Sequence, residues 1–230
     1  KAALEMALWD IAGKVANMPV CRLLGGPVRE TMPIKLVIGA FDRPDVIRLA
    51  ERFLEMGVTC LKVKTGIHPE EDLARVGTVR EVAGPDIPIT IDSNCGWNIT
   101  TARQTLNRMA DLNILLAEQP IPPNDPSAMA SLRSTVPMPI MADESVFTLT
   151  DAWTVCAAGA ADILSVYPGK HGGILGTIEI VNVAKAAGIV CAIGSNLELG
   201  IGTAAMLHVA AALPTINSET YPADLVGPLY

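Results

Sequence analysis

Charged residues and long hydrophobic runs are both scarce in this chain of 230 residues. Only 18% of the residues are charged and 50% are hydrophobic, which excludes a disordered chain, because disordered chains are rich in charge and poor in apolar residues. The longest uncharged stretch, Leu199 to Ser218, is interrupted by glycine, histidine and proline. A membrane-spanning helix needs about 20 predominantly apolar residues, so the sequence predicts no membrane span.

A basic surface and a metal-type cysteine pattern are also missing. The 17 Lys and Arg residues are scattered and are outnumbered by 24 Asp and Glu residues, which argues against nucleic acid as a partner. The five cysteines show neither close pairing nor metal-type spacing, so we expect reduced thiols. Reduced cysteines are typical of a cytoplasmic protein, which is the localisation we expect, and the first residues do not have the pattern of a signal peptide.

The chain starts inside a helical pattern. Leu4, Leu8, Ile11 and Val15 recur at helical spacing, and the pattern ends near Asn17. We therefore expect this chain to be a piece of a longer protein.

Beyond residue 30, short apolar runs alternate with amphipathic segments. Strands are predicted over 34–38, 60–64, 87–92, 114–118, 140–143, 163–167, 190–194 and, with a fainter pattern, 215–218. Helices are predicted over 44–56, 69–83, 100–110, 125–135, 149–158, 172–187 and 200–213. Such alternation indicates an α/β fold with parallel strands, and seven or eight units favour a (β/α)8 TIM-type barrel. An open doubly wound sheet would have a glycine-rich fingerprint after its first strand, and none follows Ile38.

Polar residues stand where the predicted strands end. In a (β/α)8 barrel these ends meet at one mouth, where the chemistry takes place. From Lys64 through Asp92, Glu118 and Asp143 to Tyr167 the steps are 28, 26, 25 and 24 residues, which is one βα unit each time. The residues are Lys62, Lys64, Asp92, Asn94, Glu118, Asp143, Tyr167, Lys170, Asn196 and Glu198.

Three of these residues are acids on neighbouring strands: Asp92, Glu118 and Asp143. Buried carboxylates that lie close together need a positive partner, and a set of oxygen ligands suits Mg²⁺ before Mn²⁺. The alternative is that each acid binds loop amides or pairs with lysine. Three acids on successive strands, beside two lysines, favour the metal site over this alternative.

Lys62 and Lys64 are two residues apart on one strand, so we expect both side chains on one face, inside the barrel. Repulsion between two ammonium groups favours the neutral amine, which can act as a base. The alternative is a solvated pair on an edge strand.

A divalent cation beside a basic lysine suggests one chemistry. The metal would bind a substrate carboxylate and stabilise the enediolate that forms when the lysine removes the α-proton. Glu198 would hydrogen-bond the intermediate, or else cap the helix that begins near residue 200.

The motifs and their order resemble the enolase superfamily, specifically the barrel domain of the mandelate racemase/muconate lactonizing group. The motifs are Ala7-Leu-Trp-Asp-Ile-Ala-Gly-Lys14, Leu23-Leu-Gly-Gly26, Lys62-x-Lys64, Asp92-x-Asn94-x-Gly96-Trp97, Glu118-Gln119-Pro120, Asp143-Glu144-Ser145 and Lys170-His-Gly-Gly173. The resemblance implies a modified, enolase-like barrel over residues 31–230, ending soon after strand eight. Residues 1–30 would be a lead-in helix and linker from an α+β capping domain, most of which is missing here.

The resemblance also implies roles for the strand-end residues. Asp92, Glu118 and Asp143 would bind Mg²⁺, Lys64 would transfer the proton, and Lys62 would support it near the substrate carboxylate. Asn94 and Asn196 are expected to contact the substrate. Glu198 matches a glutamate of the muconate lactonizing branch, and the histidine and aspartate of a mandelate-type racemase are missing, so that branch is favoured.

The chain departs from this branch at Tyr167. There the opposing catalytic lysine usually opens a Lys-x-x-Lys/Arg-x-Gly-Gly motif, whereas here the lysine stands at Lys170. Either Lys170 reaches the site or Tyr167 serves the second face, and a phenol is a poor base at neutral pH, which disfavours two-base racemisation. The Asp-x-Asp of dipeptide epimerases is replaced by Asp224-Leu-Val226, which disfavours a dipeptide substrate.

These inferences predict a Mg²⁺-dependent enzyme that acts on a small carboxylate, as a muconate cycloisomerase-like isomerase. One alternative is a dehydratase of acid sugars or hydroxy acids. Another is a non-catalytic barrel whose acids and lysines form a ring of salt bridges. We also expect a homo-oligomer, because the outer helices of such barrels often pack in symmetric assemblies.

Overall fold

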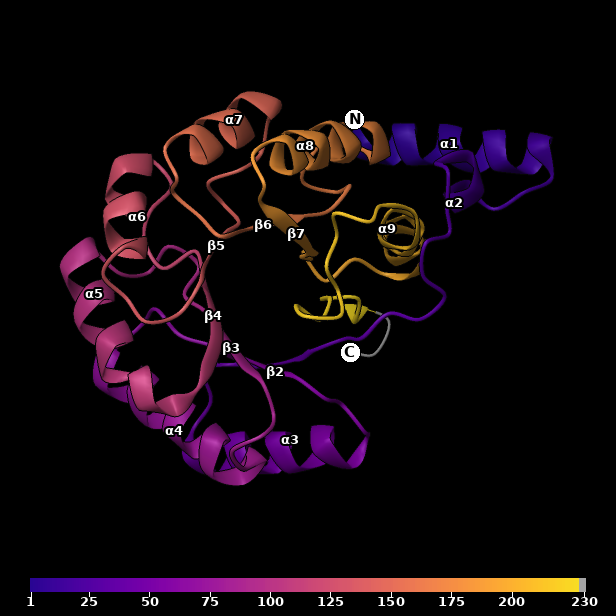
Figure 1. Ribbon diagram of the computed structural model, residues 1–230. Helices are drawn as coiled ribbons and strands as arrows, with labels where there is room; N and C mark the ends of the chain where they lie inside the picture. The colour runs from indigo at the N-terminus through magenta and orange to yellow at the C-terminus, as the bar shows by residue number, and fades with distance from the viewer. Residues whose placement is uncertain (228–230) are drawn as a thin grey trace. The chain divides into compact units, whose positions relative to one another are not determined.

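The computed structural model describes residues 1–227 and divides them into two compact units. One unit comprises Lys35–Ser145 with Ala157–Ile163, and the other comprises Lys1–Ile34, Val146–Cys156 and Leu164 onward. Strands and helices alternate along the chain, as Figure 1 shows by colour, so the predicted α/β class is confirmed. Within residues 1–227, no helix is both long and apolar enough to cross a membrane.

The unit that contains residues 35–145 is a parallel sheet with helices after each of its first four strands. Its strands pair in chain order, each parallel to the next. The strands are β1 (Leu36–Ile38), β2 (Leu61–Lys64), β3 (Ile89–Asp92), β4 (Ile114–Glu118) and β5 (Ile140–Ala142). The helices are α3 (Arg43–Glu55), α4 (Pro69–Ala83), α5 (Ile99–Arg108), η1 (Ala110–Leu112) and α6 (Pro126–Arg133).

The other unit combines the helices of the first residues with the last strands. It contains α1 (Ala2–Ala16), α2 (Val20–Leu23), most of α7 (Leu149–Ala157) and of β6 (Ile163–Val166), and then α8 (Ile174–Ala186), β7 (Val190–Ile193) and α9 (Gly200–Ala212). β6 and β7 are neighbours, and the amide of Gly194 donates to the carbonyl of Val166.

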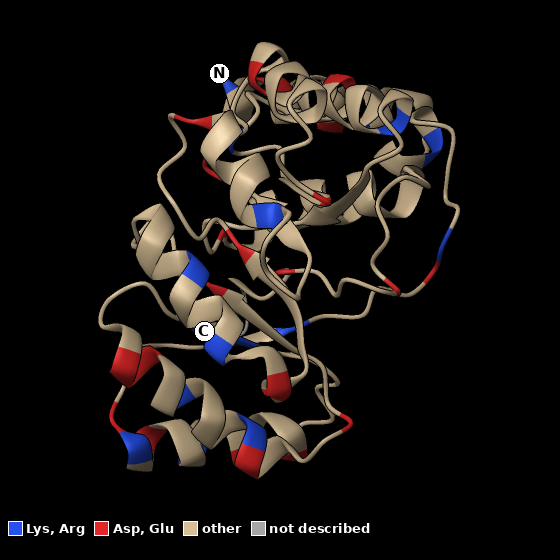
Figure 2. Ribbon diagram, turned by 60° about the vertical axis from the view of Figure 1, so that its left-hand side comes forward, with Lys and Arg blue, Asp and Glu red and all other residues tan. Residues whose placement is uncertain are grey.

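The strands are buried on both faces, which explains why they appear in the sequence as continuous apolar runs. All four residues of β3 and of β6 are buried. Charge is placed on the helices instead. Figure 2 shows acidic and basic residues on α3 and α4, where Arg43 and Glu81 pair at 2.9 Å. The low charge content of the chain therefore reflects a large two-sided core.

The predicted strand over 215–218 is wrong. This segment makes only an isolated parallel bridge, between Ile216 and Cys191, because a turn begins directly after it. In that turn Asn217 accepts hydrogen bonds from the amides of Thr220 and Tyr221. The first strand is also shorter than predicted and begins at Leu36.

Glu5 on α1 binds the first turn of α8. Its carboxylate accepts hydrogen bonds from the amides of Ile174 (2.7 Å) and Leu175 (2.8 Å) and from Nε1 of Trp9 (2.8 Å). Gly173 leaves room for it, because a Cβ at that position would lie 2.2 Å from Oε2 of Glu5. An anion at a helix N-terminus is stabilised by free amides and by the helix dipole.

We expect Glu5→Ala to lower the free energy of unfolding by about 1–2 kcal/mol, because α8 loses its acceptor at two amides. Urea unfolding followed by circular dichroism measures the change. Glu51→Ala, on an exposed position of α3, should change stability by less than about 0.5 kcal/mol. Equal effects of the two substitutions would contradict the capping role of Glu5.

Candidate active site

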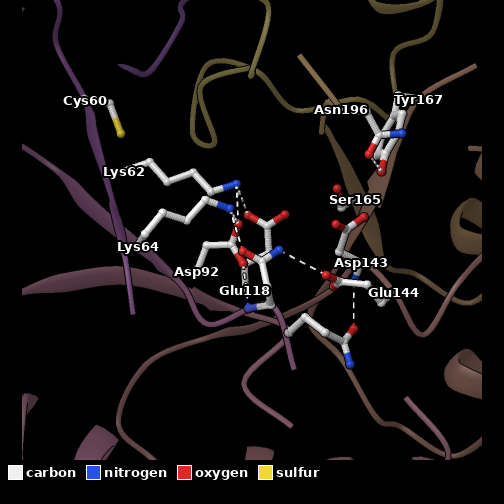
Figure 3. A network of polar contacts seen from close by, with 12 residues as sticks. Cys60, Lys62, Lys64, Asp92, Glu118, Asp143, Glu144, Ser165, Tyr167 and Asn196 are labelled. Carbon is white, nitrogen blue, oxygen red and sulfur yellow. Dashed lines mark hydrogen bonds and ion pairs between the residues drawn. The ribbon is translucent and has the colours of Figure 1, made fainter. Parts of the chain in front are cut away.

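Two lysines of β2 reach buried carboxylates on the next two strands. Nζ of Lys62 lies 3.0 Å from Oδ2 of Asp92 and 2.7 Å from Oε2 of Glu118, and Nζ of Lys64 lies 2.7 Å from the same oxygen of Asp92 (Figure 3). The strand register sets this arrangement, since Lys64 stands beside Asp92 and Asp92 beside Glu118. The prediction that both lysines share one face is confirmed.

The two lysines differ in their exposure to solvent. Lys62 is 5% exposed, whereas the side chain of Lys64 is 34% exposed. The alternative of a solvated pair on an edge strand is wrong, because β2 lies between β1 and β3 and Lys62 is enclosed by acids. Burial by itself raises the pKa of Asp92, but the ammonium groups of Lys62 and Lys64 outweigh it and hold the pKa at about 2. Asp92 is therefore ionised at neutral pH.

Asn94 links Lys64 to Glu144. Oδ1 of Asn94 accepts from Nζ of Lys64 at 2.6 Å, and its Nδ2 donates to Oε1 of Glu144 at 3.0 Å. The backbone of Asn94 is left-handed, with φ of 42°, and its amide donates to Oδ1 of Asp92. Both ends of the amide side chain thus hold neighbouring groups of the site, and the predicted contact of Asn94 with substrate stays a prediction.

Asp143 and Glu144 directly follow β5. Asp143 is 9% exposed. Burial raises the pKa of Glu144, the negative charges of Asp143 and Asp92 add to this, and the hydrogen bond from Asn94 opposes it. Burial, together with the charges of Glu144, Asp143 and Asp92, also raises the pKa of Cys95 to about 12. Cys95 is therefore a neutral thiol and has no thiolate to offer as a nucleophile.

Gln119 holds the ends of β4 and β5 together, and sequence reasoning gave it no role. It is fully buried, and its Oε1 accepts from the amides of Asp143 (2.9 Å) and Ser145 (3.1 Å). Its Nε2 donates to the carbonyl of Ile121 and to Oγ of Ser145, both at 2.8 Å. A glutamine placed directly after the buried run of β4 was the available signal for this role.

The chemistry of this cluster fits a divalent cation. Four carboxylates (Asp92, Glu118, Asp143 and Glu144) stand against two ammonium groups, so the formal charge is −2. Carboxylate oxygens are the ligands that Mg²⁺ prefers. Within residues 1–227, however, no three acid, histidine or cysteine side chains converge as a metal-binding group. The ammonium of Lys62 instead bridges Asp92 and Glu118. The predicted metal site stays a prediction.

Tyr167, Lys170 and Asn196 form a separate cluster in the other unit. Nζ of Lys170 donates to the carbonyl of Ser165 at 2.8 Å and lies 4.8 Å from the centre of the Tyr167 ring. The hydroxyl of Tyr167 donates to Oδ1 of Asn196 at 3.3 Å. The ring is buried, and Gly194 makes room for it, since a Cβ there would lie 3.0 Å from Cδ1 of Tyr167. The structure therefore ties Lys170 to the backbone of β6 and to the face of the tyrosine.

Glu198 does not cap α9, so that alternative is wrong. The helix begins after Leu199 without a side-chain cap. Instead, Oε2 of Glu198 accepts from Oγ of Ser195 at 2.8 Å and from the amide of Asn196 at 2.9 Å, because the side chain turns back over the preceding loop. The other oxygen, Oε1, is buried and accepts no hydrogen bond from residues 1–227.

Two family models match the chain. The model described as enolase C-terminal domain-like matches residues 45–226, and the model of the mandelate racemase/muconate lactonizing enzyme N-terminal domain matches residues 1–25. Because the first covers most of the chain, the chain belongs to the enolase C-terminal domain-like family, and the predicted resemblance is confirmed.

Curated relatives of the chain are isomerases of several kinds. The chain is 35% identical to the N-succinyl-L-Arg/Lys racemase of Bacillus cereus and 37% identical to muconate cycloisomerase 1 of Rhodococcus opacus. Each match covers 100% of this chain and 61% of the relative, so the chain spans about three fifths of the length of these enzymes.

Solved structures show the same fold. The L-Ala-D/L-Glu epimerase of Bacillus subtilis, in a substrate-liganded complex, matches with a TM-score of 0.94 at 32% identity, over 99% of this chain and 63% of its own. The muconate lactonizing enzyme of Pseudomonas fluorescens, complexed with muconolactone, matches with a TM-score of 0.94 at 33% identity, over 99% and 61%. The chain thus has the enolase-type α/β fold predicted for it.

Proposed function

We propose that this chain carries the base of a Mg²⁺-dependent isomerase, which removes the proton next to a substrate carboxylate and forms an enediolate. The observation that carries the proposal is the network at the ends of β2, β3 and β4, where two lysines alternate with two buried carboxylates. Membership of the enolase-like family and the isomerases among the relatives support it.

The exposure of the two lysines assigns their roles. Lys64 is the base, because its side chain is one-third exposed and can meet a substrate, and in its neutral form Nζ accepts the α-proton. Lys62 is enclosed between Asp92 and Glu118 and supplies a fixed positive charge beside the substrate carboxylate. Asp92, Glu118 and Asp143 would hold Mg²⁺, which would neutralise charge developing on that carboxylate.

The remaining residues complete the proposal. Asn94 and Asn196 would bind substrate, and Glu198 would hydrogen-bond the intermediate through Oε1, the buried oxygen that accepts no hydrogen bond from residues 1–227. Cycloisomerisation of a muconate-type acid is the reaction that we favour. In the lactone-forming direction one carboxylate adds to a double bond, the other becomes the enediolate, and the ammonium form of Lys64 would donate the proton to the α-carbon. In the reverse direction neutral Lys64 would remove that proton and the lactone C–O bond would break. The relatives also include epimerases of dipeptides, but the segment Asp224-Leu-Val226 lacks the second aspartate expected of that substrate class.

We expect the complete protein, with Mg²⁺ in ²H₂O, to exchange the α-proton of only one enantiomer of a chiral carboxylate substrate. The reason is that the position of the usual second lysine holds Tyr167, and a phenol is a poor base at neutral pH. Proton NMR of each enantiomer of acid-sugar and hydroxyproline-type acids, and of the lactone product of a muconate-type acid, measures the exchange. Interconversion of enantiomers would contradict the one-base assignment, and no exchange with any acid would contradict the proposed function.

A further inference from the structure

The turn that follows Lys64 is held by two side chains of α4. Oδ2 of Asp72 accepts hydrogen bonds from the amides of Gly66 (2.9 Å) and Ile67 (3.0 Å). Nη1 of Arg75 donates to the carbonyl of Lys64 at 2.9 Å and to Oδ1 of Asp72 at 2.8 Å. The pair therefore binds the backbone at Lys64 itself and at two of the next three residues.

This pair is buried, which makes it rigid. Asp72 is 0% exposed and Arg75 is 8% exposed. Oδ2 of Asp72 binds the turn after β2, and Oδ1 binds the guanidinium of Arg75 on α4. Removing one partner of a buried ion pair leaves an uncompensated charge, and such changes are strongly destabilising.

The same turn is packed tightly against the turn after β3. A Cβ at Gly66 would lie 2.2 Å from the carbonyl oxygen of Ser93, and a Cβ at Gly96 would lie 2.1 Å from the carbonyl oxygen of Gly66. The amide of Thr65 also donates to the carbonyl of Asp92 at 2.9 Å. Asp92 is the last residue of β3 and Asn94 lies in the turn that follows it, and both residues accept hydrogen bonds from the ammonium of Lys64.

We propose that Asp72 and Arg75 are positioning residues that set the place of the Lys64 amine relative to the reacting carbon; this proposal rests on the proposed function. They fix the backbone of Lys64 from α4, and Asp92 and Asn94 fix its Nζ. A displacement of about 1 Å at a catalytic group can cost about 100-fold in rate. The pair would therefore act on the rate of proton transfer rather than on the binding of substrate.

The chain offers a matched control with a similar pair at the opposite end of a strand. Arg133 pairs with Asp162 at 2.6 Å, and Oδ2 of Asp162 accepts from the amide of Ile140 at 2.9 Å. Ile140 is the first residue of β5, whereas Lys64 is the last residue of β2. Loss of the Asp162 pair should reduce stability without moving a residue of the site.

The test compares Asp72→Asn and Arg75→Lys with Asp162→Asn in the complete protein. For the first two variants we expect kcat for α-proton exchange to fall about 10- to 100-fold while KM changes by less than about twofold. Arg75→Lys keeps the positive charge and serves if Asp72→Asn does not fold. For Asp162→Asn we expect a lower Tm and unchanged kcat. A fall in kcat no larger than that of Asp162→Asn, once corrected for the folded fraction, would overturn the proposal.

A second measurement is independent of activity. The ¹H–¹⁵N NMR signal of the Lys64 ammonium, identified by its loss in Lys64→Met, should shift or broaden in Asp72→Asn and Arg75→Lys and stay in place in Asp162→Asn. An unmoved signal would overturn the positioning role even in a protein without detectable turnover. Absence of exchange in the wild-type protein, with a shifted signal in the variants, would instead reject the proposed function and keep the positioning of Lys64.

Discussion

Lys64→Ala is expected to reduce solvent deuterium incorporation at the substrate α-carbon by about 10³-fold or more. General base catalysis by a positioned side chain contributes about 10²- to 10⁴-fold, and Lys64 is the more exposed of the two lysines that contact Asp92. The loss in stability should be small, because Asp92 keeps its contact with Lys62 at 3.0 Å. Proton NMR of the substrate in ²H₂O, with calorimetric titration of Mg²⁺, separates the two effects.

A matched surface variant controls for this prediction. Lys185 is exposed near the end of α8, so Lys185→Ala should leave both exchange and Mg²⁺ binding unchanged. Retained exchange in Lys64→Ala would remove Lys64 as the base. Loss of Mg²⁺ binding in the same variant would show that the lysine supports the acids rather than the proton transfer.

Asp143→Asn is expected to abolish the stabilisation of the protein by Mg²⁺ and to cost little stability in metal-free buffer. The contacts of Lys62 with Asp92 and Glu118, and of Lys64 with Asp92, do not involve Asp143, so this substitution leaves these three contacts intact. A ligand at 100 times its Kd stabilises the folded state by about 2.7 kcal/mol, which appears as a rise in Tm. Thermal unfolding with and without Mg²⁺ therefore measures the loss.

Two further variants make this result decisive. Asp45→Asn, on α3, where the side chain is 48% exposed, should keep the full Mg²⁺-dependent rise in Tm. Asp92→Asn should destabilise the protein by about 3–5 kcal/mol even without metal, because two lysines lose a carboxylate partner. If the wild-type protein shows no rise in Tm with Mg²⁺, the ring of salt bridges becomes the better description of the cluster.

The alternation of strands and helices was predictable because each buried strand leaves a continuous apolar run. The bounds of β4 and of α4 agree with the prediction at both ends. The prediction of a strand over 215–218 was wrong for a local reason, since the turn at Asn217 leaves this segment with a single isolated bridge to Cys191. Short apolar runs carry no information about how many of their amides find a partner strand.

The strand-end residues of the site were predictable from their spacing, but their partners were not. Lys62 and Lys64 were expected on one face of β2, and in the structure the ammonium groups of both contact Asp92. Gln119 and Asp72 escaped notice because their roles depend on side chains that bind backbone amides across a turn. Sequence spacing gives the strand on which a residue lies, whereas hydrogen bonds to the backbone depend on loop conformation.

The contact between Glu5 and α8 limits how the two halves of the family can be exchanged. Residues 1–25 match the N-terminal domain model, yet Glu5 supplies the acceptors for the first amides of α8, a helix that lies within the C-terminal match. A chimera that joins a foreign N-terminal domain after residue 25 would lose this carboxylate unless the donor places an acid at the same position. In this chain α1 therefore depends on α8 for the contacts of Glu5, although residues 1–25 match the N-terminal domain model.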